Sequence, residues 1–239
     1  MDKKVIAIIA AMDEEVNEIK KIMNDQTCIE KRGIKIIIGN IEQNECLLAK
    51  CDVGKVNSAR ITQFIIDNYN IKYIINVGSS GAINSELNIG DIVIADKVVQ
   101  YDFDISVFNH KKGYIPNVGN FVKLDNYLIE KSNDILKIII ENDELENVKI
   151  KIGTIATGDT FCTDIQQKQY IYNEFNADAV EMEGGAIAQV SYLSNIPCLI
   201  IRSISDTPNG SNSITFDQFL KLASRRCADF LYKLISYNK

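Results

Sequence analysis

Residues 5–15 read VIAIIAAMDEE, an uninterrupted apolar run followed directly by polar and acidic residues. An apolar run of this length is typical of a strand that is buried on both faces of a sheet. After it, Val16, Ile19 and Ile22 recur at helical spacing, which predicts a helix from about residue 13. The chain therefore opens with a strand that leads straight into a helix, the unit from which α/β proteins are built.

The same alternation continues to the end of the chain. Further strands are predicted at residues 34–38, 45–53, 71–77, 92–99, 148–156, 179–182 and 197–203. Helices are predicted after residue 54, at 125–140, 164–175 and 184–194, and from residue 215. We expect one α/β domain over residues 1–239, with helices on both faces of a mainly parallel or mixed sheet. Residues 101–121 are irregular and predict a long loop, of a kind that is usually functional or mobile.

Composition and charge narrow the class of function. The 239 residues are 46% hydrophobic and 24% charged, as in an ordinary globular protein. The net charge of −6 argues against a surface for nucleic acid or an anionic membrane, and favours a neutral or cationic small molecule as partner. No apolar run approaches the roughly 18–20 residues that span a bilayer. The acidic residues after Met12 do not fit the cleavage site of a signal peptide.

Cysteine and histidine usage predicts a reduced, cytoplasmic protein without a metal centre. The six cysteines form no C-x-x-C pair and no metal-ligand spacing, and several lie inside apolar runs. Free core thiols are expected in a reducing compartment. His110, the only histidine of the sequence, cannot by itself form a zinc site or a Ser/His triad.

Polar residues leave four of the predicted strands, where ligands lie in folds of this class. These residues fall in the segments Met12–Glu15, Gly78–Gly81, Glu181–Glu183 and Arg202–Asp206. The backbone amides of Gly78–Gly81 suit an anion or a polar ligand, although the spacing is not that of a Walker loop. Phe161 and Phe216 could each place a ring near a planar ligand, or belong to the core.

The acidic residues each have two interpretations. If the strand continues through Met182, Glu181 and Glu183 face the same side and need a bridging group such as a sugar diol, a cation or Arg202. Otherwise they are the solvated first turn of the next helix, as Glu15 also could be. Asp206 next to Ser205 could be a partly desolvated acid with a raised pKa. The residues alone favour its second interpretation, a turn over residues 206–210.

Together these segments resemble the family of 5'-methylthioadenosine/S-adenosylhomocysteine nucleosidases over nearly the whole chain. The motifs that carry the resemblance occur in the family's order: Ala10–Val16, Asn76–Gly81, Gly90–Val93, Gly158–Phe161, Val180–Gly184, Arg202–Asp206 and Phe216–Phe219. The resemblance implies a single three-layer α/β/α domain with a central mixed sheet, similar to the nucleoside phosphorylases, and a homodimer. It implies hydrolysis of the N-glycosidic bond of 5'-thio-substituted adenosines to adenine and a thioribose, with neither metal nor organic cofactor.

The resemblance also implies roles for individual residues. Asp206, held by Ser205, would protonate N7 of adenine, and Glu15 would activate the water. Glu183 and Met182 would bind the ribose, and Arg202 and Ser79 would help to position the water. The adenine would be held by Phe161 and Cys162. The other substrate-binding residues that the resemblance implies are Met12, Ser80, Gly81, Glu181 and Phe216.

These roles fit the chemistry of breaking an adenine–ribose bond. The reaction needs a proton for the departing base, an anionic environment for an oxocarbenium-like sugar, and a water on the opposite face. Asp206 must then be protonated, while Glu15 and Glu183 are expected to stay ionised. A negative site would favour the cationic transition state over the neutral substrate.

Two alternatives remain open. A phosphorylase would use phosphate in place of water, but phosphorylases of this type carry an arginine where this chain has Asn76, and Glu15 would repel phosphate. A nucleoside-binding module without turnover would be expected to lack one of Glu15, Glu183 and Asp206, all of which are present. The segment 103–119 matches the family poorly, so the 5'-group preference stays open, with 6-amino-6-deoxyfutalosine as a further substrate candidate.

Overall fold

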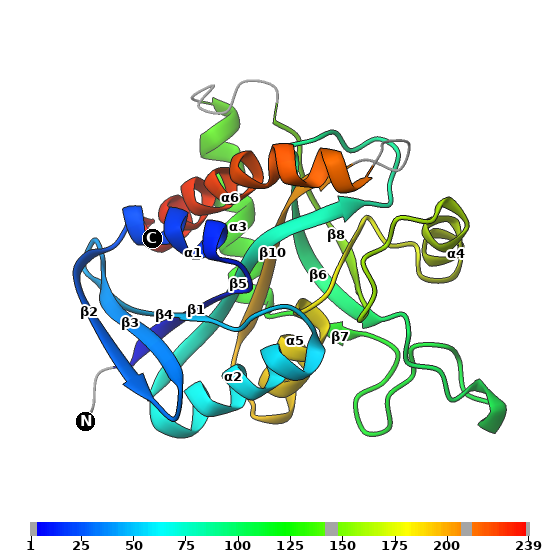
Figure 1. Cartoon of the computed structure of the whole chain (residues 1–239), viewed down its shortest axis with the longest axis horizontal. Helices are drawn as coiled ribbons and strands as arrows, with labels where there is room; N and C mark the ends of the chain where they lie inside the picture. Colours follow the sequence, from blue (N-terminus) through cyan, green and yellow to red (C-terminus); the bar gives the residue numbers. More distant parts are fainter. Residues whose placement is uncertain (1–3, 142–147, 207–211, 238–239) are drawn as a thin grey trace.

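The computed structural model describes residues 4–141, 148–206 and 212–237 of the chain. Strands and helices alternate along it, as expected for an α/β protein (Figure 1). The strands are β1 (Val5–Ala10), β2 (Asn24–Lys31), β3 (Ile34–Ile41), β4 (Asn44–Lys50), β5 (Ile71–Ala82), β6 (Ile92–Gln100), β7 (Val122–Lys123), β8 (Ile150–Thr157), β9 (Ala179–Glu181) and β10 (Cys198–Asp206). The helices are α1 (Asp13–Lys21), α2 (Lys55–Asn68), α3 (Asn126–Glu141), α4 (Ile165–Phe175), α5 (Gly184–Leu193), α6 (Asn212–Ser236) and the 3-10 turn η1 (Ser106–Phe108).

The strands form one mixed sheet, as predicted. The order along it is β10-β6-β8-β9-β5-β1-β4-β3-β2, and β7 pairs with β6. β1 runs parallel to both β4 and β5, whereas β2 and β3 add antiparallel strands at the edge. β10 pairs with β5 as well as with β6, so β5, β10, β6, β8 and β9 close into a ring. This closure gathers the ends of several strands around one rim.

Helices cover both faces of the sheet in a three-layer arrangement. In Figure 1, α1, α3 and α6 lie on one face, α2 and α5 lie on the other, and α4 stands at the side beside β8. Apolar side chains of α1, α3 and α6 share a buried cluster with alternate residues of β1 and β5, among them Ile8 and Ile75. The opposite residues of β1, such as Ile9, pack with α2 and α5. Burial of both strand faces explains the continuous apolar runs of the sequence.

The structure differs from the sequence-based expectations at several individual segments. β2 and β7 were not predicted, because β2 is a polar, exposed edge strand and β7 has only two residues. Gly78–Gly81, which we expected to follow the strand that ends at residue 77, is part of β5 and pairs with β10. β9 ends at Glu181, so the strand does not continue through Met182. Asp206 is the last residue of β10, and residues 207–210 of the turn that the sequence favoured lie outside the described residues.

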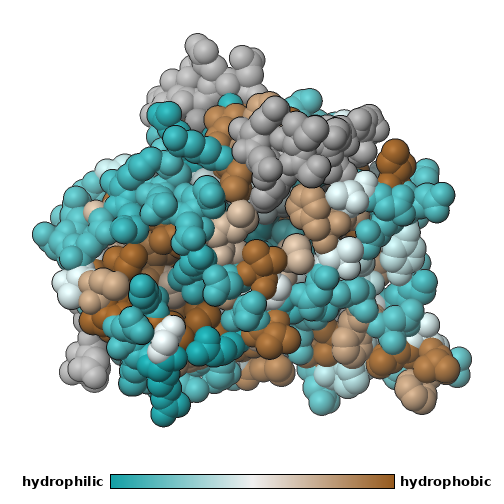
Figure 2. Space-filling view, viewed as in Figure 1, coloured by the Kyte–Doolittle hydropathy of each residue, from teal (hydrophilic) through white to brown (hydrophobic). Residues whose placement is uncertain are grey.

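The helices, the thiols and the surface add three observations. No helix of the described part is long and apolar enough to cross a bilayer. All six cysteines are free, and five of them are buried. The viewed face is largely hydrophilic, with separate hydrophobic areas at its centre and along its lower edge (Figure 2).

Candidate active site

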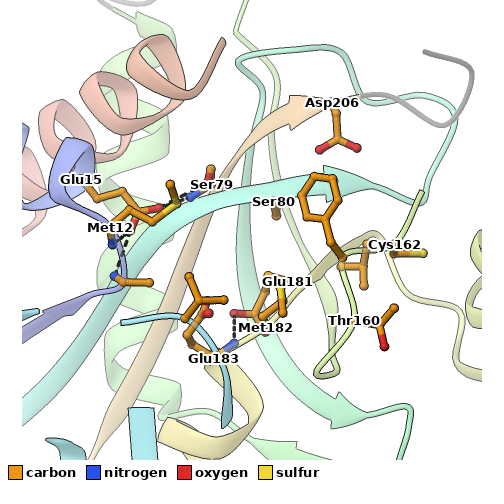
Figure 3. Close-up of a pocket in the computed structure, with 15 residues that line it drawn as sticks. Met12, Glu15, Ser79, Ser80, Thr160, Cys162, Glu181, Met182, Glu183 and Asp206 are labelled. Atoms are coloured by element: carbon orange, nitrogen blue, oxygen red, sulfur yellow. Dashed lines mark hydrogen bonds between the residues drawn. The ribbon is translucent and has the colours of Figure 1, made fainter. Parts of the chain in front are cut away.

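A cavity of about 340 Å³ lies where strand ends meet at the rim of the ring. This volume is at the lower end of the roughly 300–1,000 Å³ typical of small-molecule sites. Figure 3 shows Glu15 and Asp206 at opposite sides of the cavity, with Glu181, Met182 and Glu183 between them. The structure thus brings together carboxylates from three separate parts of the chain.

Glu15 is fixed in place by backbone donors. It sits in the first turn of α1, is 4% exposed, and its Oε2 accepts hydrogen bonds from the N–H of Ala11 at 2.9 Å and of Met12 at 3.1 Å. Its Oε1 accepts from the N–H of Ser79 at 2.9 Å and faces the Ser79 hydroxyl at 3.3 Å. Glu15 is therefore an acid in the first turn of a helix, and its side chain faces the cavity instead of solvent. Both interpretations that the sequence left open apply to it.

Arg202 connects the other carboxylates from behind the cavity wall. It is 1% exposed, and its Nη2 donates to Oε2 of Glu181 and, at 2.6 Å, to Oδ1 of Asn76. The same nitrogen lies 3.8 Å from Oε2 of Glu183. Burial lowers the pKa of Arg202, but the nearby carboxylates raise it further, so the guanidinium stays charged. Arg202 therefore neutralises buried acids and does not line the cavity.

Glu181 is a structural acid with a full set of partners. It accepts from the Thr157 hydroxyl and from the backbone N–H groups of Glu183 at 3.0 Å and Gly184 at 2.7 Å. Its ion pair with Arg202 completes the set. Both Glu181 and Glu183 are buried, so the interpretation of the pair as a solvated helix turn is wrong.

Glu183 caps the start of α5 and points into the cavity. Its Oε1 accepts from the N–H of Gly54 at 2.9 Å, which ties α5 to the entry of α2. Burial, and then the charge of Glu181, raise the pKa of Glu183 to about 8. This shift favours the protonated form of Glu183, in contrast to the ionised carboxylate that we expected from the sequence.

Asp206 lies at the end of β10 and is 2% exposed. Burial raises its pKa, which the Lys168 ammonium and the Ser205 hydroxyl partly offset. The Ser205 Oγ is 3.3 Å from Oδ1 of Asp206 and 3.2 Å from the carbonyl oxygen of Ser80. A buried carboxyl with a raised pKa is suited to donating a proton near neutral pH.

The structure places the sequence-predicted residues as follows. Eleven of the fourteen line the cavity: Glu15, Glu183, Asp206, Met12, Ser79, Ser80, Gly81, Phe161, Cys162, Glu181 and Met182. Arg202 and Ser205 lie behind the wall, in contact with lining residues. The Phe216 side chain lies outside the described residues. Phe161 is 44% exposed although it lines the cavity, so its ring stands at the opening instead of in the core.

Sequence reasoning missed several residues of the site. Val53 and Thr160 line the cavity, Gly54 holds Glu183, and the buried Lys168 contacts Asp206. Asn76, weighed only as the place of a missing arginine, donates from Nδ2 to the Ile9 carbonyl at 2.9 Å and accepts from Arg202. A signal existed for Lys168, because it shares a helical face with Ile171 and Phe175, three and seven residues on.

Gly78 and Gly81 are small because carboxylates lie against them. A Cβ at Gly78 would come within 2.7 Å of Oε1 of Glu15, and one at Gly81 within 2.9 Å of Oδ2 of Asp206. Within the described residues, no group of three His, Cys, Asp or Glu side chains is arranged to hold a metal ion.

Comparisons with known proteins agree with this geometry. Residues 5–236 match the family model described as the phosphorylase superfamily. The chain is 37% identical over 231 residues to the 5'-methylthioadenosine/S-adenosylhomocysteine nucleosidase of Bacillus licheniformis, covering 96% of this chain and 97% of that protein. It is 36% identical over 229 residues to the aminodeoxyfutalosine nucleosidase of Campylobacter jejuni, with the same coverage.

A solved structure extends the likeness to three dimensions. The crystal structure of a putative 5'-methylthioadenosine/S-adenosylhomocysteine nucleosidase from Borrelia burgdorferi, bound to adenine, superposes with a TM-score of 0.88 at 40% identity. The match covers 97% of this chain and 99% of that one. The chain therefore belongs to the phosphorylase superfamily and, within it, to the family of 5'-methylthioadenosine/S-adenosylhomocysteine nucleosidases.

Proposed function

We propose that this protein hydrolyses the N-glycosidic bond of 5'-methylthioadenosine and S-adenosylhomocysteine, releasing adenine and the 5'-thioribose. The observation that carries the proposal is the placement of Glu15 and Asp206 at opposite sides of one cavity, with Glu183 between them. Cleavage of this bond needs an acid on the side of the base and a base on the side of the attacking water.

The two ends of the cavity have different chemistry. Asp206 is the general acid, because burial raises the pKa of its carboxyl and so favours the protonated form, which can pass its proton to N7 of the adenine. Glu15 is the general base, because its two oxygens are aimed by the N–H groups of Ala11, Met12 and Ser79. A base whose orientation is fixed before substrate arrives loses no freedom when the water is activated.

The wall between them suits the sugar. A neutral Glu183 carboxyl can donate to one ribose hydroxyl and accept from the other, with Gly54 fixing its Oε1. Ser80 belongs to the cavity wall, and its buried hydroxyl has no hydrogen-bond partner within the described structure. Phe161 at the opening supplies a ring face for the adenine, which Cys162 borders.

Water fits this site better than phosphate does. Phosphate needs cationic or multiple neutral donors, but the described lining residues include neither lysine nor arginine and do include the Glu15 carboxylate. Asn76 stands at the place of the phosphorylase arginine, and both polar groups of its side chain are hydrogen-bonded, to the Ile9 carbonyl and to Arg202. These contacts support hydrolysis over phosphorolysis.

We also propose that residues 1–239 act as one nucleosidase domain, in the cytoplasm and as a homodimer. The six free thiols support a reducing compartment. Val107 and Phe108, on η1 in the 101–121 loop, are 83% and 71% exposed, and Val56 on α2 is 79% exposed. The adjacent exposed side chains Val107 and Phe108 suit a protein-contact surface, and in a dimer this loop would help to close the 5' end of the substrate pocket.

A second substrate deserves the same assay. Identity to the aminodeoxyfutalosine nucleosidase of Campylobacter jejuni is 36%, close to the 37% for the enzyme from Bacillus licheniformis. Aminodeoxyfutalosine would use the same acid, base and ribose contacts and differ at the 5' group.

The experiment that tests this function is product analysis with purified protein. We expect release of adenine and methylthioribose from 5'-methylthioadenosine in phosphate-free buffer, and no acceleration by phosphate. Inosine serves as a control nucleoside, and S-adenosylhomocysteine and aminodeoxyfutalosine rank the 5' groups by kcat/KM. Release that requires phosphate would make the protein a phosphorylase, and no release from any of these adenosines would contradict the proposal.

A further inference from the structure

Helix α4 carries a lysine that is buried against the acid end of the cavity. Lys168 is 3% exposed, and its Nζ donates to Oδ2 of Asp206 at 3.2 Å. The two side chains are only 4% and 3% exposed, so solvent scarcely screens the pair. A fully buried lysine is rare unless it is paired, and its partner here is the residue that would deliver the proton.

Proton transfer creates a need for such a partner. When the proton of the Asp206 carboxyl passes to N7 of the adenine, the N-glycosidic electron pair goes to the departing base and Asp206 is left as a buried carboxylate. A buried anion without a counter-charge is strongly disfavoured. An ammonium already in contact with Oδ2 stabilises this anion as it forms, and needs no rearrangement during the step.

We propose that Lys168 is a positioning residue for the general acid: it holds Oδ2 of Asp206 at the cavity wall and stabilises the carboxylate that remains once the base is protonated. The inference rests on the proposed role of Asp206. It assigns Lys168 a function that acts through Asp206, because Lys168 is not among the residues that line the cavity.

Among the described residues around Asp206, Lys168 carries the charge that lowers the pKa of Asp206 against the effect of burial. β10 contributes the Ser205 hydroxyl and β5 contributes Ser80 and Gly81, none of which carries a charge. In the segment before α4, burial raises the pKa of the Cys162 thiol to about 11, so it is neutral at working pH. Asp164 caps α4 at its exposed start, and the other carboxylates of the cavity belong to Glu15, Glu181 and Glu183.

The lysine has a measurable consequence for pH dependence. Burial raises the pKa of Asp206 and the Lys168 ammonium lowers it, so removal of the ammonium must raise it further. The alkaline limb of the kcat/KM profile reports loss of the proton from the free enzyme's acid. In Lys168→Met we expect the midpoint of this limb to move up by about one pH unit or more. At pH values below this limb, we also expect kcat of Lys168→Met to be roughly tenfold lower than that of the wild type. This loss is part of the rate enhancement that a positioned general acid contributes.

The test compares pH profiles of four proteins between about pH 5 and 10, with 5'-methylthioadenosine as substrate. Lys168→Arg keeps the charge and should keep the midpoint near that of the wild type. Gln169→Met, on the exposed side of α4, is the matched control and should change neither midpoint nor kcat. If Lys168→Met does not fold, Lys168→Gln carries the same expectation with a polar side chain of similar length.

A double variant separates positioning from general support of the fold. If Lys168 acts through Asp206, Lys168→Met should slow Asp206→Asn by much less than it slows the wild type. An alkaline midpoint that stays in place in Lys168→Met, or equal slowing in both backgrounds, would overturn the inference. An inactive wild type would contradict the proposed function itself, so the two failures are distinguishable.

Discussion

The backbone N–H of Ser79, inside β5, donates to Oε1 of Glu15, in the first turn of α1, over 2.9 Å. The bond joins two segments that are 64 residues apart and fixes the side chain that we assign as the base. The hydrogen bond needs space for the Glu15 carboxylate beside β5, and Gly78 leaves that space free because it has no side chain. The small residues of β5 therefore make room for a carboxylate.

The first prediction tests this close approach. Gly78→Ala would place a Cβ within 2.7 Å of Oε1 of Glu15, so the carboxylate must move while the strand itself is little disturbed. We expect kcat to fall about 10²-fold, the scale of a displacement near 1 Å in a catalytic group. Steady-state kinetics and the thermal midpoint check this together. A variant with full activity would show that the position of Glu15 does not matter to the rate.

The second prediction concerns the acid. Asp206→Asn removes the proton donor but keeps the shape of the side chain and an oxygen for Lys168. Turnover of 5'-methylthioadenosine should fall by 10²–10⁴-fold, the usual contribution of general acid catalysis. Folding and nucleoside binding should be largely retained in circular dichroism and calorimetric titration. Retained turnover would remove Asp206 from the acid role.

The third prediction concerns the ribose contact. Glu183→Gln keeps the acceptor for the Gly54 N–H but loses the carboxyl that would meet both ribose hydroxyls. KM should rise and kcat should fall, each by roughly tenfold, the worth of about one hydrogen bond to a charged or strongly polar group. A 2'-deoxy analogue should lose less in the variant than in the wild type. Unchanged kinetics would place Glu183 outside the substrate contacts.

The fourth prediction links the same residue to stability. Burial raises the pKa of Glu183 from 4.5 to about 8 in the folded protein. As pH rises, the unfolded chain therefore releases this proton at a lower pH than the folded protein does. Between about pH 4.5 and 8 the folded state binds more protons, and the free energy of unfolding must fall as pH rises through that window. Urea denaturation at several pH values should show a smaller fall in Glu183→Gln. Equal pH dependence in both proteins would argue against a neutral Glu183.

The fifth prediction tests assembly. Phe108→Asp puts a charge on an apolar side chain that is 71% exposed, which a monomer tolerates and an apolar interface does not. Analytical ultracentrifugation should find a dimer for the wild type and a shift towards monomer for the variant. Ser106→Asp in the same turn is the control for added charge. A dimer of unchanged stability in Phe108→Asp would place the interface elsewhere.

Sequence reasoning succeeded where one local pattern had one structural meaning. The run that begins at Val5 became a buried strand because apolar residues on both faces leave no other placement. It failed where the outcome depends on distant partners. Gly78–Gly81 was expected to follow the strand that ends at residue 77, but it continues β5 because β10 pairs with it. Glu181 and Glu183 were expected either to share a face of a continuing strand or to lie in a solvated helix turn. Instead both are buried, with Glu181 paired to Arg202 and Glu183 accepting from the Gly54 N–H.

The site shows the same division. The residue types at the strand ends were sufficient to select the acids, because ligands gather there in folds of this class. The residues that hold those acids could not be read from the chain. Lys168 is 38 positions from Asp206 and Gly54 is 129 positions from Glu183, so only the fold brings these pairs together.

The most direct test of the central claim follows the oxygen of the attacking nucleophile. Wild-type protein should be given 5'-methylthioadenosine in phosphate-free buffer made with oxygen-18-enriched water, and the sugar product analysed by mass spectrometry within one turnover of the enzyme. If Glu15 activates water, methylthioribose should appear with one heavy oxygen, and the rate should not rise when phosphate is added. Methylthioribose 1-phosphate without the label, formed only in the presence of phosphate, would contradict the account.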